Sequence, residues 1–165
     1  MNTFNFNTTP SIVFGNGVSS TSCDKILEKL GDNIFIITDT GLTDIGLNKK
    51  IIDTLSKFSA VKVFDEVESD PSIRTLLKTL KDAKNFKPTG ILGFGGGSSM
   101  DIAKLVSLLM GNEQDIENIW GVGNVKGPRL PLVLVPTTAG TGSEVTPISI
   151  ITQEDDEKKK EYHLQ

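Results

Sequence analysis

Short apolar runs alternate with helix-period segments along this chain, and this alternation constrains its fold most strongly. Residues 34–37, 90–94 and 132–135 are continuous runs of apolar residues and glycine. A strand inside a parallel sheet is covered on both faces, so it carries apolar residues at successive positions instead of alternating ones. These runs therefore predict buried strands. Two further strands are expected at residues 60–64 and 148–152.

The segments between these runs have the spacing of helices with one apolar face. Such helices are expected at residues 18–30, 47–58, 73–86 and 98–110. Alternating strands and helices imply right-handed crossovers, so the expected fold class is α/β, a Rossmann-like open, mostly parallel sheet with helices on both faces. Ahead of the first helix, residues 3–6 and 11–14 predict a short N-terminal hairpin.

Length and charge narrow the class of protein. A chain of 165 residues with 37% hydrophobic and 23% charged residues fits one folded domain. The net charge is −4 at pH 7, and the basic residues gather only at residues 158–160. No basic face for nucleic acid is therefore expected. The run at residues 158–160 fits a solvated turn.

The chain has one cysteine, Cys23, on the apolar side of the first predicted helix. One cysteine forms no internal disulfide, and this position favours a small core residue over a nucleophile. Trp120, in a loop between glycines, is expected to anchor packing. Residues 1–10 have no leader pattern, and no stretch reaches the roughly twenty apolar residues that span a bilayer. We expect a cytoplasmic protein outside the membrane.

The strongest chemical signal is the segment Gly-Phe-Gly-Gly-Gly-Ser-Ser-Met-Asp at residues 93–101. It leads from a predicted strand directly into a predicted helix. Consecutive glycines let the backbone turn tightly and approach a ligand, and the helix offers unpaired N–H groups and the positive end of its dipole. The segment therefore predicts a phosphate site at Gly95, Gly96, Gly97 and Ser98.

This segment differs from two familiar phosphate-binding loops. Ser98 stands where the usual dinucleotide fingerprint has its third glycine, and Lys104 is not where a P-loop requires its lysine. The alternative is a glycine-rich turn in which Ser98 caps the helix and Asp101 acts as a capping-box partner. The two interpretations are compatible.

Asp39 follows the predicted strand at residues 34–37. Ligands of open α/β sheets gather beyond the carboxyl ends of the strands, and a carboxylate there can accept hydrogen bonds from both hydroxyls of an adenosine ribose. Because it would repel a 2′-phosphate, it favours NAD over NADP. The alternative is that Asp39 only caps the turn into Thr40 and Gly41.

A loop of small and hydroxyl-bearing residues follows the predicted strand at residues 132–135. Its sequence, Pro-Thr-Thr-Ala-Gly-Thr-Gly-Ser-Glu at residues 136–144, can approach a polar ligand closely and donate several hydrogen bonds to it. Such loops are common, so this one gains weight only beside the glycine-rich segment.

Together, residues 95–104 and 136–144 resemble the paired signature of iron-containing (metal-dependent, group III) alcohol dehydrogenases. Three shorter segments fall where that family would place them, at residues 37–39, 70–72 and 150–152. The resemblance covers essentially the whole chain. It implies an NAD-binding domain over residues 1–165, from an enzyme that interconverts small primary alcohols or diols and aldehydes by hydride transfer.

The resemblance also implies the cofactor-binding residues, which are Asp39, Gly95, Gly96, Gly97, Ser98, Asp101, Thr137, Thr138, Thr141, Ser143 and Lys160. Among these, Asp39 would bind the adenosine ribose, and Gly97 and Ser98 the pyrophosphate. Thr138, Thr141 and Ser143 would surround the adenine and the nicotinamide ribose. Lys160 would also reach that ribose.

Members of this family hold a divalent metal, iron or zinc, with one aspartate and three histidines of a helical C-terminal domain. This chain has one histidine, His163, which fits a surface or strand-edge position better than a metal ligand. No metal ligand or catalytic residue is assigned, and the C-terminal domain is expected to be absent. The chain alone should bind nucleotide without turning over alcohol. Its uncovered face should favour self-association, and a homo-oligomer is expected.

Two other interpretations remain open. One is a related enzyme, a glycerol or polyol dehydrogenase or a protein similar to dehydroquinate synthase. The loop at residues 136–144 favours the alcohol dehydrogenases over these. The other is a module that binds NAD without catalysis. The polar, lysine-rich end of the chain favours a cut fragment over such a module.

Overall fold

The computed structural model describes residues 8–112, 114–121, 123–153 and 158–163, the last range by its backbone alone. A four-stranded parallel sheet runs through the molecule in the order β2-β1-β3-β4. Its strands are β1 (Asn33–Ile37), β2 (Ala60–Phe64), β3 (Gly90–Gly95) and β4 (Leu132–Pro136). The predicted parallel sheet is confirmed.

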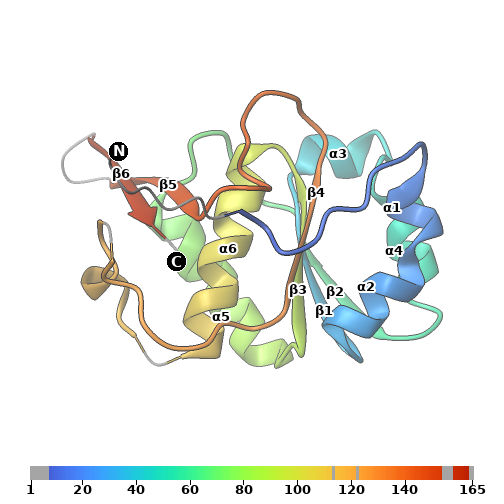
Figure 1. Ribbon diagram of the computed structural model, residues 1–165, viewed down its shortest axis with the longest axis horizontal. Coiled ribbons are helices and arrows are strands. Elements are labelled where there is room, and N and C mark those ends of the chain that lie inside the picture. Colours follow the sequence, from blue (N-terminus) through green and yellow to red (C-terminus); the bar gives the residue numbers. More distant parts are fainter. Residues whose placement is uncertain (1–7, 113, 122, 154–157, 164–165) are drawn as a thin grey trace, which may run out of the picture.

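Helices cover both faces of this sheet, as predicted (Figure 1). On one face lie α2 (Cys23–Leu30) and α4 (Lys49–Leu55). On the other face lie α5 (Ile73–Phe86) and α6 (Gly97–Gly111). The α/β fold class is therefore confirmed.

The two cores explain the continuous apolar runs. In β1, Ile34 and Ile36 belong to the core shared with α2 and α4, whereas Phe35 and Ile37 belong to the core shared with α5 and α6. All four side chains are fully buried. Successive side chains of a strand point to opposite faces, so a strand between two helical layers needs an apolar residue at each position.

The strand order creates a switch point in the sheet. The chain passes from β1 outward to β2 and then crosses to β3, on the other side of β1. The helices that follow β1 and β3 therefore lie on opposite faces of the sheet. The carboxyl ends of these two strands leave a crevice between them, which is where open α/β sheets bind ligands.

The helix α6 is buried on all sides and is not the helix with one apolar face that its sequence predicts. Its residues from Ser99 to Leu109 are all buried. The sheet covers one side of α6, and α5 and the strand β5 (Ile148–Gln153) cover the rest (Figure 1). A helix enclosed in this way needs apolar residues around its whole circumference, which explains the sparse charges of this segment.

Two predicted helices are shorter than expected. Residues 18–30 form α1 (Val18–Thr21) and α2, which are separated at Ser22. The segment 47–58 contains only α4, and its outer residues Leu47 and Phe58 are 52% and 69% exposed. Leu47 precedes the N-cap of α4 and Phe58 follows its C-cap, so neither continues the apolar face of the helix.

The predicted N-terminal hairpin is wrong in its second segment. Residues 11–14 belong to no strand, and Phe14 is 98% exposed. The first segment, residues 3–6, lies outside the described residues. Apolar and β-branched residues favour an extended backbone here, but a strand also requires a hydrogen-bonding partner.

The strand β5 pairs antiparallel with β6 (Lys158–His163) in a separate two-stranded sheet against α6 (Figure 1). Residues 158–160 therefore lie in a strand, and their interpretation as a solvated turn is wrong. Backbone hydrogen bonds to β5 hold them in place, and lysines are tolerated in a strand at the edge of a sheet.

Two single residues behave as predicted. Cys23 is 6% exposed in the core beside α2, and burial followed by the neighbouring Asp24 raises the pKa of its thiol. Trp120 follows the short 3-10 helix η1 (Ile116–Asn118) and packs against the core beneath α6. In the part of the chain that the structure describes, no helix has the length and apolar character needed to cross a membrane.

Candidate functional site

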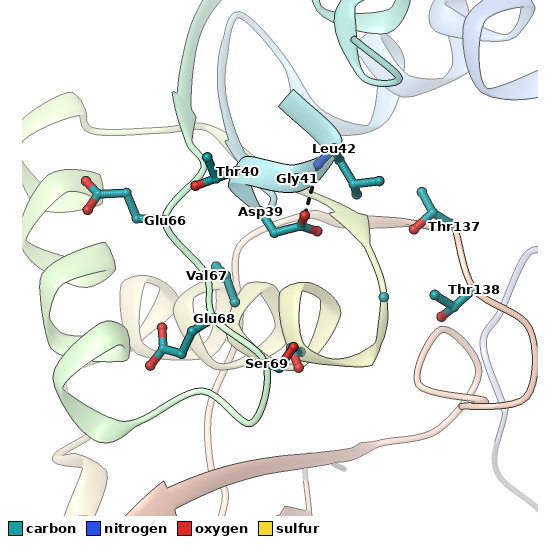
Figure 2. Close-up of a pocket in the computed structure, with 12 residues that line it drawn as sticks. Asp39, Thr40, Gly41, Leu42, Glu66, Val67, Glu68, Ser69, Thr137 and Thr138 are labelled. Atoms are coloured by element: carbon teal, nitrogen blue, oxygen red, sulfur yellow. Dashed lines mark hydrogen bonds between the residues drawn. The ribbon is translucent and has the colours of Figure 1, made fainter. Parts of the chain in front are cut away.

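A cleft of about 680 Å³ opens beyond the carboxyl ends of β1 and β3, at the switch point of the sheet (Figure 2). It is formed by the segments that follow all four strands. Its lining residues are Asp39, Thr40, Gly41, Leu42, Glu66, Val67, Glu68, Ser69, Gly96, Ser98, Thr137 and Thr138. Five of them, Asp39, Gly96, Ser98, Thr137 and Thr138, are in the predicted set.

Asp39 uses its two carboxylate oxygens differently. It is the N-cap of the short helix α3 (Thr40–Asp44), and Oδ1 accepts a hydrogen bond from the backbone N–H of Leu42 at 3.0 Å (Figure 2). The predicted capping role is therefore confirmed. Oδ2 lies toward Gly95, 3.4 Å from where a Cβ of that residue would stand. Among the described residues, Oδ2 has no hydrogen-bond partner, so it remains available to a ligand.

The glycine turn, residues 95–97, joins β3 to α6. Gly95 has φ 156°, and a Cβ on it would lie 2.7 Å from the Oγ of Ser99. Gly96 is the N-cap of α6, and no side chain caps this helix. The first N–H groups of a helix have no partner within it, so those of the first turn of α6 can receive an anion.

The capping alternative for Ser98 and Asp101 is wrong. Ser98 lies inside the first turn of α6, one residue beyond Gly97, where the helix begins. The position of the N-cap is taken by Gly96 because its extended backbone (φ −78°, ψ −171°) leads directly out of the strand. The side chain of Asp101 has other partners, which are described below.

The threonine loop, residues 137–142, lies against the glycine turn. Its first residue, Thr137, donates its backbone N–H to the carbonyl of Gly95 at 2.9 Å. A Cβ on Gly96 would lie 3.4 Å from Thr138, and a Cβ on Gly97 would lie 3.4 Å from Thr141. A Cβ at either glycine would therefore be in ordinary van der Waals contact with the loop, so the two segments pack directly against each other.

Asp101 and Ser143 lie behind the cleft instead of lining it. Ser143 is 6% exposed, and its hydroxyl donates to Oδ1 of Asp101 at 2.7 Å. Asp101 is 9% exposed and also accepts from Lys104 and from the backbone N–H of Ile150. The structure therefore groups two residues of the predicted set in a buried network away from the cleft.

The remaining members of the predicted set are placed as follows. Thr141 does not line the cleft; it lies beside Gly97 and accepts a hydrogen bond from the N–H of Ser143. Lys160 lies in β6, where its backbone pairs with Ile151, and its side chain is outside the description.

Sequence reasoning missed several residues of this region. Glu66, Glu68 and Ser69 line the cleft and follow β2, so the carboxyl-end rule that singled out Asp39 would also have found them. Lys104 was passed over as well, although it is the one charge in the apolar stretch 102–110. A lone charge in such a stretch is a signal for a buried, paired group.

Glu68 also has a structural role at the cleft. Its carboxylate accepts hydrogen bonds from the N–H and the hydroxyl of Ser72, at 2.9 and 3.0 Å, and from the hydroxyl of Thr75 at 2.6 Å. Burial alone would raise the pKa of Glu68, but these hydrogen bonds outweigh it and lower the pKa below its ordinary value. The charged carboxylate therefore stabilises the start of α5.

Comparison with known proteins decides the family. The model of the family described as iron-containing alcohol dehydrogenase matches residues 9–165. This chain belongs to the iron-containing alcohol dehydrogenases. The resemblance seen in the residues 95–104 and 136–144 is thereby confirmed.

Individual relatives agree with this family. The sulfoacetaldehyde reductase of Bilophila wadsworthia is 36% identical over 154 residues, which are 93% of this chain and 40% of that protein. The crystal structure of a 1,3-propanediol oxidoreductase matches 99% of this chain and 43% of its own, with 27% identity and a TM-score of 0.90. The sulfoacetaldehyde reductase of Bifidobacterium kashiwanohense, solved in complex with NAD+, matches 100% of this chain and 44% of its own, with 27% identity and a TM-score of 0.85. The chain thus spans less than half the length of these relatives.

The metal that the family name implies has no ligand set among the residues that the structure describes. The described residues contain no group of three or more histidine, cysteine, aspartate or glutamate side chains that could hold an ion. The side chain of His163 lies outside the description. The residues that the structure describes therefore do not fit a metal site.

Proposed function

We propose that this chain is the NAD-binding part of an iron-containing alcohol dehydrogenase that interconverts small primary alcohols or diols and aldehydes. One observation carries the proposal. The cleft at the switch point brings together a carboxylate, a glycine turn at a helix N-terminus and a threonine loop. These are the groups that a dinucleotide needs for its ribose, its pyrophosphate and its heterocyclic rings.

Different residues of this region would bind different parts of the dinucleotide. The backbone N–H groups of Gly97 and Ser98 would receive the pyrophosphate, because they begin α6 and no side chain caps that helix. Oδ2 of Asp39 would accept a hydrogen bond from the adenosine ribose. The hydroxyls of Thr137 and Thr138 would form hydrogen bonds with the part of the nucleotide that lies beyond the end of β4. A relative solved in complex with NAD+ supports NAD as the nucleotide.

The charges around the cleft support NAD over NADP. Asp39, Glu66 and Glu68 all line it. A 2′-phosphate would bring further negative charge toward these carboxylates, whereas the ribose hydroxyl of NAD brings none. Glu66 is paired with Lys78, and the oxygens of Glu68 accept hydrogen bonds from Ser72 and Thr75, so Asp39 is the carboxylate that is left to meet the ribose directly.

When bound, NAD supplies the hydride acceptor for oxidation of an alcohol. The residues described here would bind and orient it. The alcohol, the metal and the catalytic residues are assigned to the remainder of the enzyme, so the 165-residue chain alone should not turn over alcohol. We further propose that the protein is cytoplasmic and that it forms a homo-oligomer. The homo-oligomer is supported by Ile12 and Phe14, whose apolar side chains are 67% and 98% exposed and would be covered by a second chain.

Calorimetric titration of the chain with NAD, NADP and ADP-ribose tests the proposal. NAD and ADP-ribose should bind. Gly97→Val should weaken binding, because its Cβ would already contact Thr141 at 3.4 Å and its two methyl groups need further space beside the glycine turn. Gly15→Val is the matched control, since a Cβ on Gly15 meets no atom within 4 Å. If the folded wild-type chain binds none of the three nucleotides, or if Gly97→Val binds them normally, the proposal fails.

A further inference from the structure

A buried ion pair lies behind the cleft. Asp101 and Lys104 stand one turn apart on α6, and Nζ of Lys104 lies 2.9 Å from Oδ1 of Asp101. The two residues are only 9% and 2% exposed. Removing two charges from water costs more free energy than their attraction restores unless further hydrogen bonds satisfy them. The other partners of the pair therefore indicate what it does.

Lys104 binds the segment that follows the threonine loop. Its Nζ donates to the carbonyl oxygen of Ser143 at 3.1 Å, to that of Thr146 at 3.5 Å and to that of Ile148. These carbonyls span the turn between the loop and β5. The ammonium group of Lys104 thus holds this turn against α6 through three carbonyl oxygens.

Asp101 binds the same segment from the other side of the ion pair. Its Oδ1 accepts from the hydroxyl of Ser143 at 2.7 Å, and its Oδ2 accepts from the N–H of Ile150 at 3.0 Å. Its backbone carbonyl accepts from the hydroxyl of Ser149 at 3.2 Å. Both oxygens of the carboxylate are therefore used within the protein, and neither is directed to a ligand.

The threonine loop is thus anchored at its start to the last residue of β3 and at its end to α6. Thr137 fixes its start through the carbonyl of Gly95, and Ser143 fixes its end through the ion pair. Between these anchors, the hydroxyl of Thr141 accepts from the N–H of Ser143 at 3.4 Å, and its methyl group faces Gly97. A continuous chain of contacts connects the ion pair to the glycine turn.

We infer that Asp101 and Lys104 are positioning residues of the cofactor site, which hold the threonine loop against the glycine turn. The inference rests on the proposed NAD binding. It assigns Asp101 and Ser143 a role different from the direct cofactor contact that the family resemblance implies. They act through the loop, while Thr137 and Thr138 meet the nucleotide.

The electrostatics around Lys104 fit this role. Burial lowers the pKa of Lys104. The nearby carboxylates of Asp101 and, to a smaller extent, Glu144 oppose this shift, whereas Arg129 adds a smaller lowering effect. Asp101 is therefore the main group that opposes the effect of burial on the pKa of Lys104. The charge of Lys104 strengthens the hydrogen bonds that it donates to the loop.

The decisive variant replaces both charges with apolar side chains, Asp101→Leu with Lys104→Met. An apolar pair of similar volume in place of a buried ion pair preserves folding in other proteins. NAD affinity, measured by calorimetry, should fall by about ten-fold, the effect of losing one charged hydrogen bond network that orders the site. Leu55→Ala is the control, because it empties a fully buried position in α4, away from the cleft. It should lower the unfolding temperature and leave NAD affinity unchanged.

Adding Ser143→Ala to each background separates positioning from direct contact. In the wild-type chain this change should weaken NAD binding, whereas in the double variant it should cause no further loss, because its partner Asp101 is already gone. Equal losses in both backgrounds would show that Ser143 contacts the nucleotide itself and would contradict the inference.

Ser143→Ala alone also decides the matter if the double variant does not fold. In this variant, amide hydrogen exchange should be faster than in the wild-type chain over residues 138–146 and unchanged in β1. Unchanged exchange in the loop, or a folded double variant that binds NAD as tightly as the wild type, would overturn the inference while leaving the proposed function intact. A folded wild-type chain that binds no NAD would overturn the proposed function first.

Discussion

Asp39 shows how much a single residue can be predicted from sequence. Its place after an apolar run indicated the carboxyl end of a strand. Because ligands of open α/β sheets bind at these ends, that position alone predicted that Asp39 lines the cleft. Capping and ligand binding stood as alternatives in the sequence. The structure shows Oδ1 capping α3 and leaves Oδ2 without a partner among the described residues, so the geometry accommodates both.

Substitution of Asp39 should separate its two roles. Asp39→Asn keeps an oxygen that can cap α3 but removes the charge, so stability should change little while discrimination against NADP relaxes. Asp39→Ala should relax discrimination equally and also destabilise the chain by about 1 kcal/mol through loss of the cap. Nucleotide affinities and urea unfolding measure the two effects. Full discrimination retained in Asp39→Asn would show that the charge does not set the preference.

Asp101 and Ser143 mark where residue-level prediction stopped. Their motifs placed them near the glycine turn and the threonine loop, which is correct. Whether they face the cleft or lie behind it depends on the packing of β5 against α6, and no local spacing encodes that contact. The lone charge of Lys104 in an apolar stretch indicated burial, but the carbonyls that it binds lie 39 to 44 residues further along the chain and could not be read from local spacing.

At the scale of elements, the strands of the parallel sheet were predicted more accurately than the helices. A strand between two helical layers leaves an unambiguous apolar run, as in β1 and β3. Helical spacing continued by chance beyond α4, where Leu47 and Phe58 are exposed. The all-round burial of α6 was not predicted, because a one-faced helix was assumed and the β5–β6 sheet that covers the other side lies far along the chain.

The start of β3 depends on close packing against α2. A Cβ on Gly90 would lie 2.6 Å from the backbone of Leu30, which side-chain movement cannot relieve. Gly90→Ala should therefore destabilise the chain by about 1–3 kcal/mol, as overpacking of a core does. Gly15→Ala, at a position with open space around it, should have little effect. Equal unfolding midpoints for the two variants would show that the strand and the helix can separate without loss.

The first turn of α5 should respond to pH through Glu68. The pKa of this residue is lowered in the folded state, so its contribution to stability is present above its ordinary pKa of 4.5 and is lost as the pH falls below that value. Glu68→Gln should therefore destabilise the chain at pH 7 and become indistinguishable from the wild type at low pH. Thermal unfolding across this range measures the difference. A constant gap between the two proteins at every pH would mean that the charge plays no part.

At the scale of the whole molecule, the order of the strands is what creates the site. The sequence indicated a parallel sheet but not that β2 and β3 flank β1, which follows from contacts between distant segments. That order places Asp39 opposite the glycine turn and brings the threonine loop beside both. Family membership, confirmed over residues 9–165, agrees with this arrangement.

Titration of the isotope-labelled chain with NAD, followed by backbone amide chemical shifts, would locate the nucleotide directly. We expect the largest changes at Gly96, Gly97 and Ser98, at Asp39 and its neighbours, and at the threonine loop, with β5 and α4 little affected. Saturating shifts confined to those segments would establish the cleft as the NAD site. Shifts centred elsewhere, or none in a folded chain at millimolar NAD, would contradict the proposed function.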